Sequence, residues 1–172
     1  MGNVTFPITN SETIGPVVGQ LVRSFNQGVA DGVVSPNNVV GASFAPGCIL
    51  KLDPAATMPG PFQLLLAAAT DVIDGMMIYD SLNNSIVTSA ALPGGSPIKF
   101  VSPSGSNAIV LYHQVGAGVS FVPGADLQYN TDGTNTLIPV TTGKRIARAI
   151  DAGVAGQVVK ISLISAYFTA QG

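Results

Sequence analysis

Cys48 and His113 are the single cysteine and the single histidine of the chain, and together they could form a nucleophile and its general base. A thiol becomes an effective nucleophile when a neighbouring base takes its proton, and Asp74 or Asp80 could orient that base. His113 stands in IVLYHQV, however, where it alternates with apolar residues that would share its strand face. This alternation favours a structural histidine, and we expect no enzymatic activity.

Metal binding by clustered carboxylates is the next kind of chemistry to consider. A metal site needs three or four converging ligands. The stretch DVIDGMMIYD offers only Asp71, Asp74 and Asp80, and their spacing does not match a calcium-binding loop. A turn at Asp74-Gly75 accounts for the stretch, so we expect no metal site.

Two glycine-containing segments partly match nucleotide-binding loops. Gly143-Lys144-Arg145 resembles the end of a phosphate loop, but Ile138 stands where its first glycine belongs and Arg145 replaces the Ser or Thr that holds magnesium. The segment GAGVSF, residues 116–121, lacks the third glycine of a dinucleotide loop and leads to another turn instead of a helix. We therefore expect no cofactor.

The composition indicates a protein that assembles with other protein subunits. Charged residues make up 9% of the 172 residues, where soluble domains average about 25%, and the formal net charge is −2. Scattered basic residues exclude nucleic acid as an expected partner, and no apolar run approaches the roughly 20 residues of a membrane span. A neutral surface is easily desolvated, which favours a protein that binds other protein subunits. A secreted β-protein with a neutral surface is the alternative.

The first 40 residues are interrupted by prolines and glycines, and we expect an extended N-terminal arm with short strands there, followed by one β-barrel domain over residues 41–172. A brief helix over Val17–Phe25 is an alternative within the arm, but Gly19 weakens it. From Val39 onward, turn signals recur at about 8- to 12-residue spacing, as is typical of a barrel or sandwich. The strands expected are 48–52, 63–68, 75–79, 86–88, 98–101, 109–114, 126–129, 138–140, 145–150 and 158–166.

The stretch RIARAIDAGVAGQVVKISLI, residues 145–164, could be one helix or a hairpin. Its second half alternates apolar and polar residues with a period of two, and a helix would lose about 1 kcal/mol at each of Gly153 and Gly156. We therefore expect a hairpin. Alternation places Arg148 with Ile146 and Ile150 on one face and Arg145 with Ala147 and Ala149 on the other.

The order of four segments carries a resemblance to a known family. They are PGCILKLD, QLLLAAATDVIDGMMIYDSLNNS, FVPGADLQYNTDGTNTLIPV and the hairpin stretch above. This order resembles the small bacteriophage head decoration, or capsid cement, proteins over about residues 44–165. The closing motif departs mildly from the family, with Ile150 where Leu is usual and Asp151 where Glu is usual.

The resemblance implies a small β-tulip-like barrel with little helix that sits on the outer face of an icosahedral head, often as a homotrimer, and binds the major capsid protein. Such a protein would be made in the host cytoplasm and end in the virion. We expect capsid or subunit contacts from the arm residues Phe6, Ile8, Ile14 and Val17 and, from charge alone, from Arg145 and Arg148. The alternatives are a tail-tube or fibre-associated virion protein and a carbohydrate-binding or hydrolytic β-domain that uses Cys48, His113 and the aspartates.

Overall fold

The structure is a computed structural model that describes residues 15–22, 29–39, 41–56, 60–79, 90–102 and 109–163. Every regular element within these ranges is a β-strand, which confirms the predicted all-β class. The strands are β1 (Val29–Val34), β2 (Ser43–Phe44), β3 (Ile49–Leu52), β4 (Phe62–Leu66), β5 (Gly75–Met77), β6 (Ala90–Ala91), β7 (Pro97–Val101), β8 (Ile109–Gln114), β9 (Ser120–Phe121), β10 (Asp126–Tyr129), β11 (Leu137–Pro139), β12 (Arg145–Ala149), β13 (Gly153–Val154) and β14 (Val158–Leu163).

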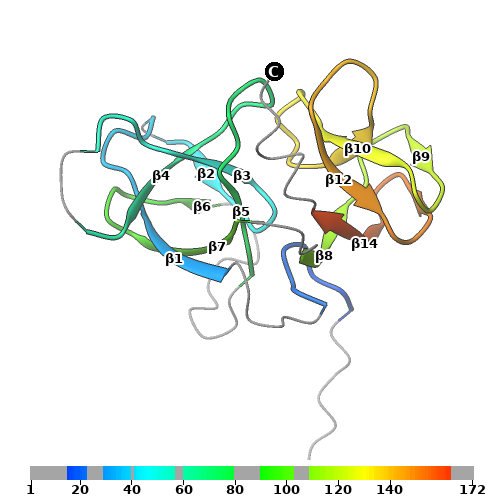
Figure 1. Ribbon diagram of the computed structural model, residues 1–172, viewed down its shortest axis with the longest axis horizontal. Coiled ribbons are helices and arrows are strands. Elements are labelled where there is room, and N and C mark those ends of the chain that lie inside the picture. The colour runs from blue at the N-terminus through cyan, green and yellow to red at the C-terminus, as the bar shows by residue number, and fades with distance from the viewer. Residues whose placement is uncertain are drawn as a thin grey trace, which may run out of the picture.

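The strands form two units that lie side by side (Figure 1). The first unit, residues 29–102, is a closed barrel with the strand order β1-β4-β3-β5-β7, together with the short ribbon β2-β6. β1 closes the barrel because it pairs in parallel with β4 on one side and antiparallel with β7 on the other. The predicted β-barrel is confirmed in this unit.

The second unit, residues 109–163, is a five-stranded sheet with the order β11-β10-β12-β14-β8, together with the ribbon β13-β9. The two outer strands of the sheet approach each other, since Val115, directly after β8, bridges Leu137 of β11. The predicted hairpin is confirmed: β12 pairs antiparallel with β14, with Ala149 opposite Ile161. The turn between them also carries β13.

Residues 19–22 precede the first unit in the sequence but pair with the second. The Gly19 N–H donates to Tyr112 O at 2.8 Å, and the Val22 N–H donates to Val110 O at 3.0 Å. The Tyr112 N–H donates back to Gln20 O at 2.9 Å, so this segment extends the sheet beside β8. The helix considered over Val17–Phe25 is therefore wrong over its described part, because these backbone groups bond to a strand.

The end of the predicted arm is also part of the fold, because β1 lies inside residues 1–40. In the sequence Gly32 looks like a break between elements, yet it lies within β1. A glycine is needed at this position because Leu64 Cδ1 lies only 2.6 Å from the place that a Cβ would occupy. A larger residue would collide with this core side chain. The boundary expected at residue 40 thus falls after the first strand of the barrel.

Most other strand predictions agree with the structure. β8 and β10 have the expected bounds, and residues 62–66 form a strand where 63–68 was predicted. The two-residue strands β2, β6, β9 and β13 were not predicted. Residues 86–88 lie outside the described residues, as do residues 164–166 at the end of the last predicted strand.

Successive residues of the barrel strands enter two different hydrophobic clusters. In β3, Leu50 packs inside the barrel and Ile49 packs against the second unit. The same alternation holds in β5, where Met77 points into the barrel and Met76 to the second unit. Because neighbouring side chains of a strand point to opposite faces, one face of the β3-β5-β7 sheet fills the barrel and the other contacts the second unit. The two units therefore share a core.

Candidate interaction surfaces

The arm residues proposed for capsid contact are mostly outside the structure's description. Phe6, Ile8 and Ile14 lie outside the described residues. Val17 is partly buried, its N–H donates to Gln20 Oε1 at 3.2 Å, and its carbonyl accepts the Gln20 N–H at 3.0 Å. Val17 thus forms the turn that leads into the segment paired with β8.

Arg145 and Arg148 both form ion pairs with Asp126 of β10. Arg145 Nη1 lies 3.2 Å from Asp126 Oδ2, and Arg148 Nε lies 3.3 Å from Oδ1. The prediction that the two arginines point to opposite faces is wrong, because the β10–β12 register shifts and leaves Ile146 as an extra residue between them. Both guanidinium groups therefore lie on the same side of β12, against one carboxylate.

Cys48 and His113 do not form a nucleophile and base. The Cys48 thiol is buried and contacts Met77 Sδ at 4.0 Å, and burial raises its pKa to about 12, so the thiolate is not populated at neutral pH. His113 is fully buried, and its Nε2–H donates to Gly47 O at 2.9 Å. Within the ranges that the structure describes, no group of three or more His, Cys, Asp or Glu side chains gathers as metal ligands, and no helix is long and apolar enough to cross a membrane.

His113 lies instead at the contact between the two units, which we call the seam. Its ring packs edge-on against Tyr129, with the centroids 6.4 Å apart. The Tyr129 hydroxyl donates to Asn135 Oδ1, and Asn135 Nδ2 donates to Pro46 O at 3.1 Å. The seam on this side is therefore made by second-unit side chains that bond to the backbone carbonyls of Pro46 and Gly47.

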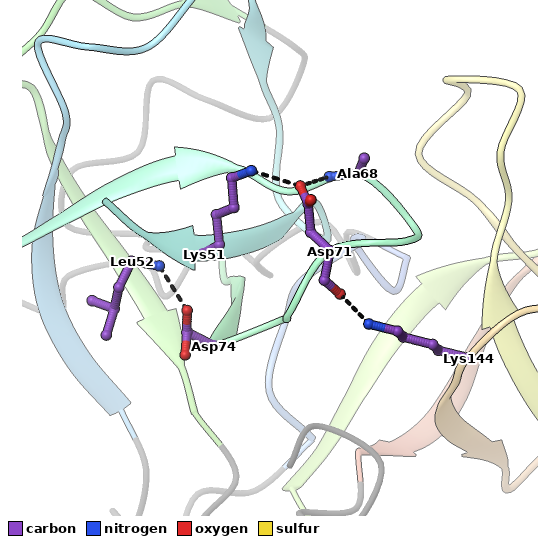
Figure 2. Close-up of polar contacts among 6 residues, drawn as sticks. All are labelled: Lys51, Leu52, Ala68, Asp71, Asp74 and Lys144. Carbon is purple, nitrogen blue, oxygen red and sulfur yellow. Dashed lines mark hydrogen bonds and ion pairs between the residues drawn. The ribbon is translucent and has the colours of Figure 1, made fainter. Parts of the chain in front are cut away.

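Asp71 and Lys144 make the polar contact of the seam shown in Figure 2. Lys144 Nζ of the second unit donates to the backbone carbonyl of Asp71 at 2.7 Å. The Asp71 carboxylate accepts from Lys51 Nζ at 2.7 Å and from the Ala68 N–H at 2.8 Å, and these bonds lower its pKa. The buried Gln128 holds the loop before Lys144, since its Oε1 accepts the N–H groups of residues 141 and 143.

A pocket of about 320 Å³ opens at one mouth of the barrel, and we call it the mouth pocket. The strand ends gather here because β1 and β4 begin at this end and the antiparallel β3 and β7 finish at it. Leu52 and Phe62 are 43% and 53% exposed, although both are large apolar residues. Asp74 is the charged residue of the lining, and its Oδ2 accepts the Leu52 N–H at 2.7 Å (Figure 2). The lining residues are Val29, Ala30, Leu52, Phe62, Asp74, Phe100 and Ser102.

Three exposed apolar residues of the second unit form what we call the tip surface: Val122, Ile150 and Val154, which are 69%, 40% and 53% exposed. Val154 of β13 stands opposite Ser120 of β9, and Val122 lies two residues further along the same face. The Gly124 N–H donates to Ala149 O at 2.8 Å, which brings this turn beside Ile150. β9 lies at the outer side of the second unit (Figure 1).

Sequence reasoning did not single out these two surfaces. Leu52 shares the alternation of Leu50, which is fully buried, so periodicity alone assigns both to the core. The available signal was position: Phe62 directly follows a Pro-Gly turn region, and Val122 directly precedes Pro123-Gly124. Apolar residues that adjoin turns at strand ends reach the rim of a barrel, where the interior no longer covers them.

Comparisons with known proteins give a likeness in fold. No family model matches the chain, and no curated protein matches it. The fold is similar to the crystal structure of the head fiber gp8.5 N base in bacteriophage phi29, with 14% sequence identity, a TM-score of 0.44, and coverage of 80% of this chain and 95% of that chain. We draw no functional conclusion from a likeness of this degree.

Proposed function

We propose that the protein is a virion structural protein that decorates a bacteriophage head. In this proposal it binds the outer face of an icosahedral shell through the major capsid protein, as a homotrimer, and has no enzymatic activity. It is made in the host cytoplasm and resides on the capsid exterior of the virion. Ligands that bind only the assembled state stabilise that state by mass action, and this is how many bound copies would strengthen the shell.

The observation that carries the proposal is the exposure of large apolar side chains on a body with very few charges. The mouth pocket and the tip surface together expose six such residues, Val29, Leu52, Phe62, Val122, Ile150 and Val154, each to 40% or more. Contiguous exposed apolar residues mark protein-binding surfaces. With charged residues at only 9% of the chain, little ionic solvation opposes their burial.

The resemblance to decoration proteins gives a second support. The quoted segments contain β3, most of β4 together with β5, the pair β10 and β11, and the β12–β14 hairpin. The segments that carry the resemblance therefore include strands of both units. Cys48 and His113, on which the hydrolytic alternative depended, are both buried, and this supports decoration over hydrolysis.

Co-sedimentation with undecorated shells from the same source tests the proposal. We expect binding that saturates at a fixed ratio to the major capsid protein, either equal or a simple fraction. The basic group around Arg145 and Arg148 predicts that binding weakens with salt if it meets an acidic patch. Absence of binding at any salt concentration would overturn the proposal, and a ring or polymer without affinity for shells would favour the tail-tube or fibre alternative.

The contribution of the arm is tested by a triple variant with Phe6→Ser, Ile8→Ser and Ile14→Ser. If these side chains are anchors, shell affinity falls roughly tenfold or more, because buried apolar anchors dominate interface energies. The matched control changes three polar residues of the same segment, with Asn3→Ala, Thr9→Ala and Ser11→Ala. Unchanged binding by the apolar variant would remove the role of the arm and leave the decoration function standing.

A further inference from the structure

We infer that the mouth pocket binds a primary ammonium group on an apolar stem, as presented by a lysine side chain of a partner protein. The inference goes beyond the proposed function and does not depend on it. The pocket has a volume of about 320 Å³ and opens at the end of the barrel, so a side chain can enter it from outside. The side chains of its lining are apolar except for the carboxylate of Asp74 and the hydroxyl of Ser102.

Neither basic residue of the first unit lies in the pocket with the Asp74 carboxylate. The two basic residues of this unit are Lys51 and Lys99. Lys51 lies on the other face of β3, where its Nζ is 2.7 Å from Asp71 Oδ2 (Figure 2). Lys99 alternates with the pocket residue Phe100 along β7, so it lies on the face of the sheet opposite the pocket. The pocket therefore presents a negative charge among apolar walls, and a cationic ligand complements it.

One oxygen of the Asp74 carboxylate is left for a ligand. Asp74 Oδ2 accepts the Leu52 N–H at 2.7 Å, and among the described residues Asp74 Oδ1 has no hydrogen-bond partner. A guanidinium group binds a carboxylate best through both oxygens at once, whereas an ammonium group is a point charge that needs only one. The bond from the Leu52 N–H thus favours a lysine over an arginine as the ligand.

The apolar walls provide contacts for the remainder of a lysine side chain. The rings of Phe62 and Phe100 are perpendicular, with their centroids 5.9 Å apart. Aromatic faces attract cations, and the methylene groups of a lysine bury well against apolar side chains such as Leu52. A sugar fits less well, because its many hydroxyl groups would find only Asp74 and Ser102 as side-chain partners and the others would lose water without a new bond.

Two glycines hold the Phe100 wall of the pocket in place. Gly32 of β1 and Gly75 of β5 lie on the two strands that flank β7. A Cβ at Gly32 would lie 3.2 Å from Phe100 Cε1, and a Cβ at Gly75 would lie 2.6 Å from Phe100 Cδ2. The ring therefore fills the space that side chains at both glycines would occupy. A wall that is fixed before binding lowers the ordering cost of binding.

The test is a titration of the full-length protein with n-butylammonium, which is the lysine side chain without its backbone, followed by NMR chemical shifts. The amides of Leu52 and Gly75 adjoin the Asp74 carboxylate, so their shifts should change and saturate. For so small a ligand we expect a dissociation constant in roughly the millimolar range. The isosteric n-butanol lacks the charge and should bind about tenfold more weakly. Propylguanidinium should also bind more weakly than butylammonium.

Variants assign the preference for butylammonium to the carboxylate. Asp74→Asn removes the charge and keeps the size of the side chain, so the difference between butylammonium and n-butanol should disappear. The matched control, Asp71→Asn, removes the carboxylate that pairs with Lys51 outside the pocket and should leave this difference unchanged. Phe62→Ala removes an exposed wall and should weaken the binding of both ligands. Circular dichroism verifies the fold of each variant, and the comparison of ligands on the wild type stands without them.

Three results with the wild type would overturn the inference: no saturating shifts with butylammonium, equal binding of n-butanol, or equal binding of propylguanidinium. A preference for butylammonium that persists in Asp74→Asn would also overturn it. The capped peptide acetyl-Ala-Lys-Ala-amide distinguishes a protein side chain from a free amine, and it should bind at least as tightly as butylammonium. Weaker binding of the peptide would overturn a partner's lysine as the ligand. None of these assays contains shells, so their failure is separate from a failure of shell binding.

Discussion

The seam between the two units and the pair formed by the mouth pocket and the tip surface both combine apolar side chains with a few polar groups. In the seam, polar side chains such as His113, Asn135 and Lys144 bond to backbone carbonyls of the other unit. No buried side-chain nitrogen or oxygen of the described residues lacks a hydrogen-bond partner. In the pocket and the tip, apolar side chains face solvent around a carboxylate or beside a basic group. The seam is thus a completed contact within one chain, whereas the apolar side chains of the two exposed surfaces remain in contact with solvent.

The largest expected effect comes from placing a methyl group in the seam. Gly47 has φ at +89°, and a Cβ there would lie 2.7 Å from Val18 Cγ1 and 2.8 Å from His113 Nε2. Gly47→Ala should lower the free energy of unfolding by about 3 kcal/mol, from the left-handed backbone and from overpacking together. Urea denaturation measures this loss.

Gly124→Ala is the matched control. Gly124 has φ at +86°, but a Cβ there would meet nothing within 4 Å. Only the backbone contribution applies, so the loss should be about 1 kcal/mol. Equal losses in the two variants would mean that the seam at Gly47 is loosely packed.

Acid should weaken the seam through its single histidine. Burial lowers the pKa of His113 below its usual range, because the imidazolium loses its water. In the unfolded chain histidine titrates near pH 6.5. The fold therefore favours neutral His113, and its stability is complete above about pH 6.5 and declines as the pH falls from there towards the lowered pKa.

Unfolding measured at a series of pH values between about 8 and 5 checks this decline. The variant His113→Gln removes the titrating group and should show a flatter profile over that interval. Hydrogen bonds from Lys51 and Ala68 lower the pKa of Asp71, so the loss from this carboxylate begins only as the pH approaches about 4. A wild-type profile that stays flat above pH 5, or an equal decline in the variant, would contradict the role given to His113.

The smallest expected effect is the difference in stability loss between removing Lys144, a cation of the seam, and removing Arg145, an exposed cation. Lys144→Met removes the bond to Asp71 O and should cost about 1 kcal/mol, since this bond is charge-assisted but only partly buried. The neighbouring change Arg145→Met removes an ion pair whose arginine side chain is 58% exposed and should cost less than about 0.5 kcal/mol. Thermal unfolding of both variants measures the difference, and the reverse order would mean that the exposed pair contributes more than the seam.

The sequence alone was sufficient to predict the strands in which apolar and polar residues alternate regularly over several positions. β8 and β14 alternate between the shared core and the other face, so both strands were predictable, as was the hairpin of β12 with β14. The pairing of β14 with β8 was not predicted. Short strands were expected in the first 40 residues, but the bounds of β1 and its place in the barrel were not predicted. Gly32 looks like a break between elements until the close approach of Leu64 is known. The two-residue ribbons are too short to show any period.

The surfaces were less predictable than the strands for a related reason. The shared face of Arg145 and Arg148 depends on a register shift against β10, and a shift of this kind is set by the partner strand, not by the local pattern. The exposure of Leu52 depends on where the barrel ends, and the alternation of apolar and polar residues along the strand does not show that position. The seam could not be predicted, because it consists of contacts between residues far apart in the sequence, such as Gly47 and His113.

The pairing of residues 19–22 with β8 fixes an order of events during synthesis. These residues leave the ribosome before the whole first barrel, but their partner strand is made only after it. The segment must therefore wait until the barrel sequence between them has been translated, and the ends of that long stretch then meet at an entropic cost that grows only slowly with its length. Joining of the two units is thus a late event in folding. A nascent chain stalled before β8 would carry a barrel whose Ile49 and Met76, which face the second unit in the finished fold, are still unprotected.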